Sequence, residues 1–341
     1  MLKKIVTMSS CALSVFLASA QTDTSKKSST TISGHADTYY RYSFTDADGR
    51  TNNFTSFTNS QNSFELGMVS VRADYSSGKL SATADIGFGK RAQDFSYNDV
   101  GSLASIKQLY ISYAVSDKLR LTTGKWATHI GYEVMDATGN RNYSMSYGFS
   151  FGPFFHTGLK ADIALGGKSA LMIGIADPSD NTGTASSTKY VLAQFSTAGR
   201  NDRLKAYLNF QSGGGVTQYN LVATAALSSK WSMAYDGSIQ TTSFNGQKSS
   251  WKSHAAYLNF DPKTTLGFTL RQDYFDDRKI NPLNIGSNIY ATTLSANLRL
   301  HQLTLIPECR MDNSRESVFT KGNGSSAKSS FTLILAAVIK I

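Results

Sequence analysis

Residues 80–88 read Leu-Ser-Ala-Thr-Ala-Asp-Ile-Gly-Phe, and apolar side chains alternate with polar or small ones along this stretch. Every even-numbered residue from Leu80 to Phe88 is apolar, whereas the odd-numbered ones are Ser, Thr, Asp and Gly. Successive side chains of a β-strand point to opposite faces, so a period of two predicts a strand with one apolar face. The same alternation recurs at 203–211, 265–271, 290–301 and 331–341, which indicates an all-β chain.

The alternating runs continue from about residue 30 to Ile341, separated by breaks rich in Gly, Asn, Asp and Ser. No linker interrupts them, so we expect one domain over residues 30–341. No apolar run of 18 residues follows the N-terminal segment, and the mean hydropathy is -0.25. Both observations fit strands that meet lipid with every second residue. We therefore predict a transmembrane antiparallel up-and-down β-barrel of about 16 strands, with 14 as the alternative count.

The first twenty residues are typical of an export signal. Lys3 and Lys4 precede the apolar run 5–17, and Ala18-Ser19-Ala20 is an A-x-A-like cleavage site. We predict a signal peptide over 1–20, cleaved near Ala20, and a short polar leader over 21–29. Cleavage removes two lysines, so the formal net charge falls from +10 to +8. An exported barrel is expected in the outer membrane of a Gram-negative bacterium, in contact with its lipid.

Short turns alternate loosely with longer polar insertions, as expected when a barrel carries short turns on one side of the membrane and long loops on the other. A constriction would come from a long loop that folds inward. The acid-bearing stretches 46–48 and 276–278 are our candidates for it. The longer insertions are 45–60, 90–104, 178–187, 243–250, 276–288 and 311–328.

The region from 107 to 161 carries more specific motifs. It contains Gly-Lys-Trp-Ala-Thr at 124–128, Asn-Tyr-Ser-Met-Ser-Tyr at 142–147 and Phe-Ser-Phe-Gly-Pro-Phe at 149–154. With the opening at 33–40, this region resembles the putative beta-barrel porin-2 family of OmpL-like porins. The resemblance is strong over residues 30–165, and it implies an outer-membrane porin. The motif positions are Gly124, Lys125, Gly131, Tyr132, Asn142, Tyr143, Ser150, Phe151, Gly152, Pro153, His156 and Gly158.

The excess of basic residues is scattered over polar strand positions rather than clustered with stacking aromatic residues, which argues against nucleic-acid binding. A lumen with net positive walls would give a mild preference for anions. The alternative is that some of these charges lie at loop ends and face headgroups or water. The candidate lumen-lining residues are Asp85, Arg203, Lys205, Arg271, Asp273 and Arg299.

No motif for catalysis, a metal or a cofactor is present. The histidines at 35, 129, 156, 254 and 301 form no metal-type pair at i, i+2 or i, i+4, and no H-E-x-x-H or G-x-S-x-G occurs. His156-Thr157-Gly158 faintly resembles the His-Ser of outer-membrane phospholipases. Cys309 is the only cysteine after the signal segment, so the mature chain has no internal disulfide. We expect no enzyme activity and no bound cofactor.

Three functions are consistent with such a barrel. The first is passive diffusion of small hydrophilic solutes through a water-filled lumen. The second is a structural or adhesive barrel whose surface loops bind a partner, and the remote third is a lipid hydrolase. Strand count separates the first two, because about 16 strands leave room for water whereas 8 to 10 do not. Fold-level analogy alone points to a homotrimer.

Overall fold

The computed structural model describes residues 28–45, 52–278 and 285–341. The expected signal peptide, the leader up to residue 27 and the candidate stretch 46–48 lie outside the described residues.

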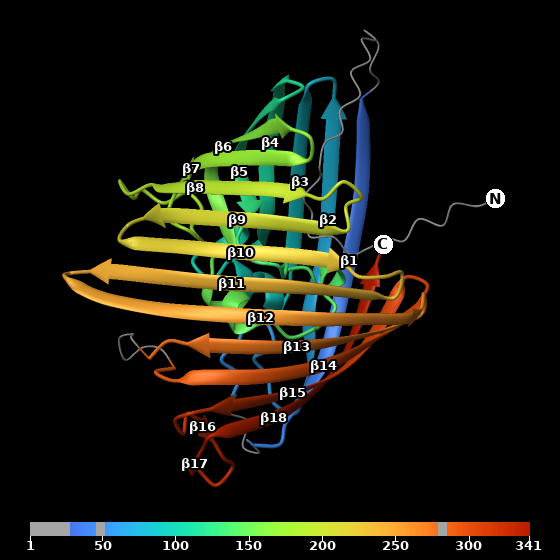
Figure 1. Ribbon diagram of the computed structural model, residues 1–341, viewed down its shortest axis with the longest axis vertical. Helices are drawn as coiled ribbons and strands as arrows, with labels where there is room; N and C mark the ends of the chain where they lie inside the picture. Colours follow the sequence, from blue (N-terminus) through green and yellow to red (C-terminus); the bar gives the residue numbers. More distant parts are fainter. Residues whose placement is uncertain (1–27, 46–51, 279–284) are drawn as a thin grey trace.

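Sixteen antiparallel strands form a closed barrel in which each strand pairs with its neighbours along the chain (Figure 1). This confirms the predicted all-β up-and-down barrel and its strand count of 16. The strands are β1 (Ser29–Ser43), β2 (Ser63–Ser77), β3 (Leu80–Phe88), β4 (Ile106–Ser116), β5 (Leu119–Ala127), β6 (Phe155–Gly166), β7 (Ser169–Ala176), β8 (Tyr190–Ala198), β9 (Leu204–Gly213), β10 (Val216–Ala226), β11 (Trp231–Phe244), β12 (Gln247–Lys263), β13 (Leu266–Asp276), β14 (Asn288–Leu300), β15 (Leu303–Ser314) and β18 (Ser329–Lys340). Shorter elements lie in the loops: α1 (Lys90–Phe95), η1 (Gly101–Ser105), η2 (Ala137–Gly139), α2 (Tyr147–Phe151), β16 (Phe319–Thr320) and β17 (Ser326–Ala327).

The first and last strands close the barrel. The register between β1 and β18 runs from His35 opposite Lys340 to Ser43 opposite Thr332. The terminal Ile341 continues this ladder, because its N–H donates to the carbonyl of Gly34 at 2.8 Å. Every strand edge is therefore paired, which is the condition for placing strands in lipid.

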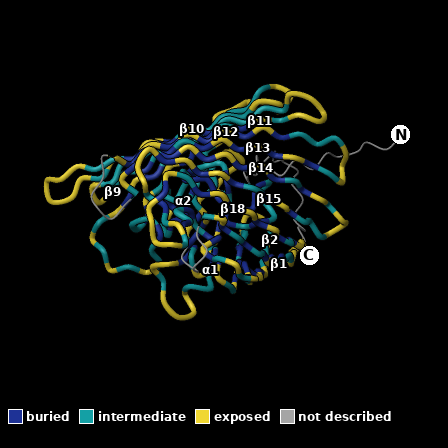
Figure 2. The backbone as a smooth tube through the Cα atoms, turned by 90° about the horizontal axis from the view of Figure 1, so that it is seen from below, coloured by how far each residue is buried: buried dark blue, intermediate teal, exposed yellow. Residues whose placement is uncertain are grey.

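The distribution of side chains is the inverse of that in a soluble protein. In β18, Leu333 and Leu335 are exposed, whereas Thr332, which lies on the other face of the strand, is buried. The fully buried set includes many charged and polar side chains, among them Arg91 and Arg271. Figure 2 shows buried and exposed positions alternating along the strands. Among the described residues, no helix combines the length and the apolar character needed to cross a membrane.

The two ends of the barrel differ. Short turns, the start of β1 and the end of β18 lie on one side, which we call the turn side, and longer connections lie on the loop side (Figure 1). The prediction of a long loop at 243–250 is wrong, because β11 and β12 continue to a hairpin tip at Asn245-Gly246. Both tip residues have positive φ, 48° and 77°, as a two-residue type I′ turn requires. Asn-Gly is the strongest short hairpin signal, and it outweighs the polar composition around it.

Pro307 lies within β15, although proline lacks the N–H that a ladder needs. On the β18 side it is paired with Leu335. On the β14 side the register skips from Ser295–Glu308 to Leu298–Leu305. The strand therefore accommodates the proline at a local break in one of its two ladders.

Candidate functional site

The chain between β5 and β6, residues 128–154, folds into the barrel, and we call it the inner loop. None of its residues is exposed. Its helix α2 lies inside the ring of strands in both overall views (Figures 1 and 2). This corrects the candidate stretch 276–278, which closes its own loop instead: the Asp277 carboxylate accepts the backbone N–H groups of Ile285 and Ser287.

The first part of the inner loop lies against β10 and β11. The N–H of Gly131 donates to Asn220 Oδ1 at 3.2 Å, and that of Tyr132 donates to Asp236 Oδ2 at 2.8 Å. Asn220 also donates to Asp236 at 2.6 Å. Buried backbone groups need partners, and here two wall side chains supply them. The loop can therefore run through the interior without forming a strand.

The middle of the inner loop reaches the opposite wall. Asp136 forms an ion pair with Lys107 at 2.7 Å, and its carboxylate lies 3.5 Å from the ring of His35. Lys107 is shared with Asp85 at 3.1 Å. One buried ammonium group on β4 is thus flanked by a carboxylate from the wall and a carboxylate from the loop.

Glu308 of β15 anchors the return of the loop. Its carboxylate accepts the consecutive N–H groups of Tyr143 at 2.8 Å and Ser144 at 3.0 Å. It also accepts the hydroxyl of Ser295 at 2.6 Å. The Tyr143 hydroxyl donates across the lumen to Asp37 of β1 at 2.6 Å. A single wall carboxylate therefore fixes the backbone of the loop at this point.

Arg271 of β13 holds the same segment from its carbonyl side. Its guanidinium donates to the carbonyls of Ser144 at 2.6 Å and Met145 at 3.2 Å. It also pairs with Glu133 of the loop at 2.8 Å and with Asp273 of its own strand at 3.1 Å. The side chain is 0% exposed. The rigid fork of an arginine suits such a multiple contact.

Arg310 on β15 repeats this arrangement. It donates to the Met145 carbonyl at 2.7 Å and pairs with Asp312 at 2.9 Å. The Tyr147 hydroxyl donates to the same Asp312 at 2.9 Å, and the guanidinium lies 5.1 Å from the centre of the Tyr147 ring. The start of α2 is thereby fixed to the wall by charge and by aromatic contact.

Apolar packing secures α2 from the other side. Ser146 caps the helix by accepting the N–H of Phe149 at 3.2 Å. The ring of Phe275 on β13 lies 5.4 Å from that of Tyr147 and 4.4 Å from that of Phe151. These distances are in the range of attractive ring pairs. Polar anchors and ring contacts together hold the loop against the β10–β15 wall.

Three predicted lumen residues lie among these buried charges. Asp85 is paired with Lys107, and Arg271 is paired with Asp273. A fourth, Lys205, is partly exposed and shares its strand face with the buried Asn209.

The other two predicted residues lie near the turn side. Arg299 pairs with Asp261 at 3.0 Å, and Arg141 of the inner loop pairs with the same carboxylate at 2.9 Å. The prediction for Arg203 is corrected. It is exposed and precedes β9, and its guanidinium donates to the carbonyls of Ala226 and Leu227, so it stabilises a turn.

The family-motif positions gather in one region of the molecule. Gly124 has φ +126°, and a Cβ there would lie 2.2 Å from the carbonyl oxygen of Leu109, so only glycine fits. Lys125 pairs with Asp99 at 2.8 Å. The positions lie on β5 (Gly124, Lys125), in the inner loop (Gly131, Tyr132, Asn142, Tyr143, Ser150, Phe151, Gly152, Pro153) and on β6 (His156, Gly158).

The hydrogen-bond partner of His156, the histidine that suggested a lipid hydrolase, is a threonine and not a serine. His156 is buried, its Nε2 lies 3.1 Å from the hydroxyl of Thr128, and its ring lies 5.2 Å from that of His129. Within the part of the chain that the structure describes, no group of three or more His, Cys, Asp or Glu is placed to hold a metal ion.

A cavity of about 510 Å³ lies on the loop side of the inner loop. It is bounded by the end of the inner loop, three other loops and β8 to β11. Asp180 ties this rim together, because its carboxylate accepts the N–H groups of Phe154 and Phe155 and the hydroxyl of Tyr97. Burial raises the pKa of Asp180 to about 6. A second cavity, between the loop and β12, is only about 10 Å³, room for about one water.

Most of the anchors were not predicted from the sequence, among them Glu133, Glu308, Arg310 and Asp312. A usable signal was present. Basic residues stand two positions before an aspartate at 72/74, 160/162, 271/273 and 310/312, and each couple forms an ion pair. In a strand this spacing places both charges on one face, so the motif marks the inward face.

Comparisons with solved structures show the same fold. The outer membrane channel DcaP of Acinetobacter baumannii is 11% identical, with a TM-score of 0.63 over 92% of this chain and 97% of that chain. OmpT of Vibrio cholerae is 8% identical, with 0.58 over 93% and 99%. A mutant of the Rh. blastica porin is 10% identical, with 0.55 over 92% and 100%. At such identities the likeness concerns the fold alone.

No curated protein matches the chain. A family model does: that of the porins described as "Putative beta-barrel porin-2, OmpL-like" matches residues 29–341. The match extends the resemblance from the motif region to the whole barrel. Family and fold together imply an outer-membrane location. The chain belongs to this family of OmpL-like outer-membrane porins.

Proposed function

We propose that the chain is a passive porin for small hydrophilic solutes, in which the inner loop sets the narrowest part of the lumen. The observation that carries this proposal is the loop itself. A connection of 27 residues (128–154) leaves the rim, crosses the lumen and is fixed to the wall by Glu308, Arg271 and Arg310. A barrel that only displayed surface loops would have no need to hold one inside.

A mild anion preference is part of this proposal, and partly exposed residues support it. The fully buried cations are neutralised by carboxylates, as Arg271 is by Glu133 and Asp273. The inward faces of β2, β5, β6 and β9 keep charges that are only partly buried. They comprise four cations and three carboxylates: Arg72, Arg120, Lys160, Lys205, Glu65, Asp74 and Asp162. This excess of positive charge is small, so weak selectivity is expected.

The orientation of the barrel in the membrane is part of the same proposal. The turn side faces the periplasm and the loop side the exterior, as in other barrels of this kind. No catalytic step or cofactor is required. A homotrimer remains the expectation from fold-level analogy.

The test is single-channel conductance of the refolded chain in a planar bilayer under a salt gradient. Resolved open steps with a reversal potential that favours chloride support the proposal. Open steps that favour potassium keep the pore and overturn the charge assignment.

A structural or adhesive barrel is the second candidate, and one observation favours it. The inner loop has no exposed residue, and the cavity between it and β12 is about 10 Å³. Absence of conductance from a barrel whose folding has been verified would therefore support this second function.

A further inference from the structure

The cavity on the loop side is lined without any basic residue. Fifteen residues line it, and none is lysine or arginine. Its polar groups are amides, hydroxyls and the carboxylates of Asp94 and Asp180. The other lining residues include the aromatic rings of Tyr97, Phe151, Phe154 and Tyr190. The charge of this lining is therefore negative, whereas basic residues lie on the turn side. Such a lining is unsuited to an anion.

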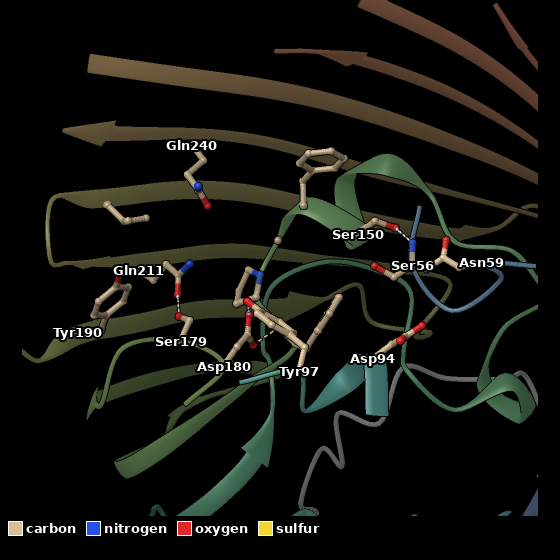
Figure 3. Close-up of a pocket in the computed structure, with 15 residues that line it drawn as sticks. Ser56, Asn59, Asp94, Tyr97, Ser150, Ser179, Asp180, Tyr190, Gln211 and Gln240 are labelled. Atoms are coloured by element: carbon tan, nitrogen blue, oxygen red, sulfur yellow. Dashed lines mark hydrogen bonds between the residues drawn. The ribbon is translucent and has the colours of Figure 1, made fainter. Parts of the chain in front are cut away.

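Tyr97 offers a fixed aromatic surface at this cavity. The residue is 58% exposed. Its hydroxyl donates to Asp180 at 3.1 Å, and its ring meets that of Phe154 edge-on at 6.1 Å. Figure 3 shows Tyr97 and Asp180 together beneath the cavity. An immobilised ring with an accessible face can stack against the C–H face of a ligand at little cost in side-chain entropy.

Amide side chains face the same space from the barrel wall. Gln211 is held by Ser179 at 2.8 Å and by Gln218 at 2.9 Å. Gln240 extends from β11 toward the cavity (Figure 3), and its side-chain amide makes no hydrogen bond with another described residue. An amide carries both a donor and an acceptor. Gln240 can therefore bind a hydroxyl group in either role.

A carboxylate completes the polar set. Asp94 of α1 pairs with Lys90 through one oxygen. Its other oxygen, Oδ2, is buried and has no hydrogen-bond partner among the described residues. A buried acceptor without a partner is costly. Because this oxygen is closed off from solvent, a ligand hydroxyl reaches it only once the carboxylate turns toward the cavity, and that would remove the cost.

We propose that this cavity binds a neutral mono- or disaccharide. Sugar hydroxyls donate and accept, which matches amides and a carboxylate, and the C–H face of a pyranose matches the Tyr97 ring. The volume of about 510 Å³ falls in the usual range for small-molecule sites. The inference deepens the proposed function, on which it rests, by naming the solute class that the loop-side mouth takes up.

The test is ligand-observed saturation-transfer NMR on the folded full chain, in a detergent without a sugar headgroup, with maltose as the probe and succinate as the anionic comparison. Maltose is expected to receive saturation and succinate is not. Tyr97→Ala should weaken maltose binding roughly tenfold, and Gln240→Ala roughly fivefold. Tyr97→Phe should retain binding, because it keeps the ring.

Matched controls exclude a general effect of the substitutions. Tyr113→Ala removes an exposed tyrosine on β4, and Gln247→Ala removes an exposed glutamine at the start of β12; neither residue lines the cavity. Both variants should bind maltose as the parent does. Saturation of succinate instead of maltose, or maltose binding that survives Tyr97→Ala and Gln240→Ala, overturns the proposal, as does absence of maltose binding to a folded barrel. Binding does not require conduction, so a barrel that binds maltose without conducting would overturn only the porin function.

Discussion

A basic residue two positions before an aspartate occurs on two walls of this barrel, and the burial of the two charges differs between the walls. On the wall bound by the inner loop, Arg271 and Asp273 are 0% and 2% exposed, and the arginine holds two loop carbonyls. On the wall of β2 to β9, Arg72 and Asp74 stand at the same spacing and form the same ion pair, yet they are 33% and 40% exposed. The motif makes an internal anchor where the loop covers it and a partly hydrated lumen surface where it does not.

The comparison separates structural charges from charges that meet solutes. A buried arginine surrounded by carboxylates and carbonyls fixes the loop and contributes little to the field in open water, because its charge is neutralised locally. A partly exposed pair contributes little to stability, but it faces the passage. The predictions below test this division, from the largest expected effect to the smallest.

Arg271→Ala should destabilise the folded barrel by about 3–5 kcal/mol, because it leaves Glu133 and Asp273 buried without their cation. Arg72→Ala is the matched control, and it should cost at most about 1 kcal/mol. Denaturant unfolding of the two variants in detergent measures the difference. Equal losses would show that the two walls do not differ as described.

Glu308→Gln should cost about 1–3 kcal/mol, because the amide replaces one of the two oxygens that accept the N–H groups of Tyr143 and Ser144. Glu65→Gln, at a partly exposed position of β2, is the matched control and should be nearly neutral. The same unfolding measurement applies. A neutral Glu308→Gln would mean that the loop does not depend on this carboxylate.

Asp180 should make stability depend on pH. Burial raises the pKa of Asp180 to about 6, from the ordinary value of 3.8 for an aspartate. The folded state therefore binds this proton more tightly than the unfolded chain does, so the stabilising contribution is present below about pH 4 and is lost as pH rises through about 6. Relative to Asp180→Asn, the parent should gain on the order of 1–2 kcal/mol between pH 7 and pH 4.5. A constant difference between the two proteins across this range would contradict the assignment.

Lys160→Gln should have the smallest effect on stability and a visible effect on selectivity. Lys160 is partly exposed on the β2 to β9 wall, 3.3 Å from Asp162. Its removal should reduce the anion preference measured under a salt gradient. Lys263→Gln, at the exposed end of β12, should leave the reversal potential unchanged. A shift in both variants, or in neither, would overturn the lumen assignment of Lys160.

Local patterns were sufficient to predict the barrel. A period of two reports directly which face of a strand is buried, so strand positions and their number follow from the sequence. The prediction of a long loop at 243–250 failed because the local hairpin signal of Asn245-Gly246 had been given too little weight. Arg271 and Asp273 share one buried face of β13, opposite the exposed Phe268 and Leu270, in line with the alternation of this strand.

The inner loop could not be predicted in the same way. Its contacts join residues far apart in the chain, such as Tyr143 with Glu308 and Gly131 with Asn220, and it has no periodicity. The family motif marked this region without indicating that it enters the lumen. The acid-bearing stretch 276–278 drew attention because of its charge, but loop composition carries no information on where a loop folds.

The central claim is that the inner loop rests on the β10–β15 wall and sets the narrowest part of the passage. Asn142 in the loop donates to the Ser295 hydroxyl on β14 at 2.6 Å. In a Cys309→Ser background, a short bifunctional thiol crosslinker should therefore join the pair Asn142→Cys and Ser295→Cys. The measurement is single-channel conductance before and after crosslinking. We predict that the bridge forms and leaves the conductance unchanged, because the loop already lies there; failure to bridge in a folded barrel, or a sharp fall in conductance on bridging, would contradict the account.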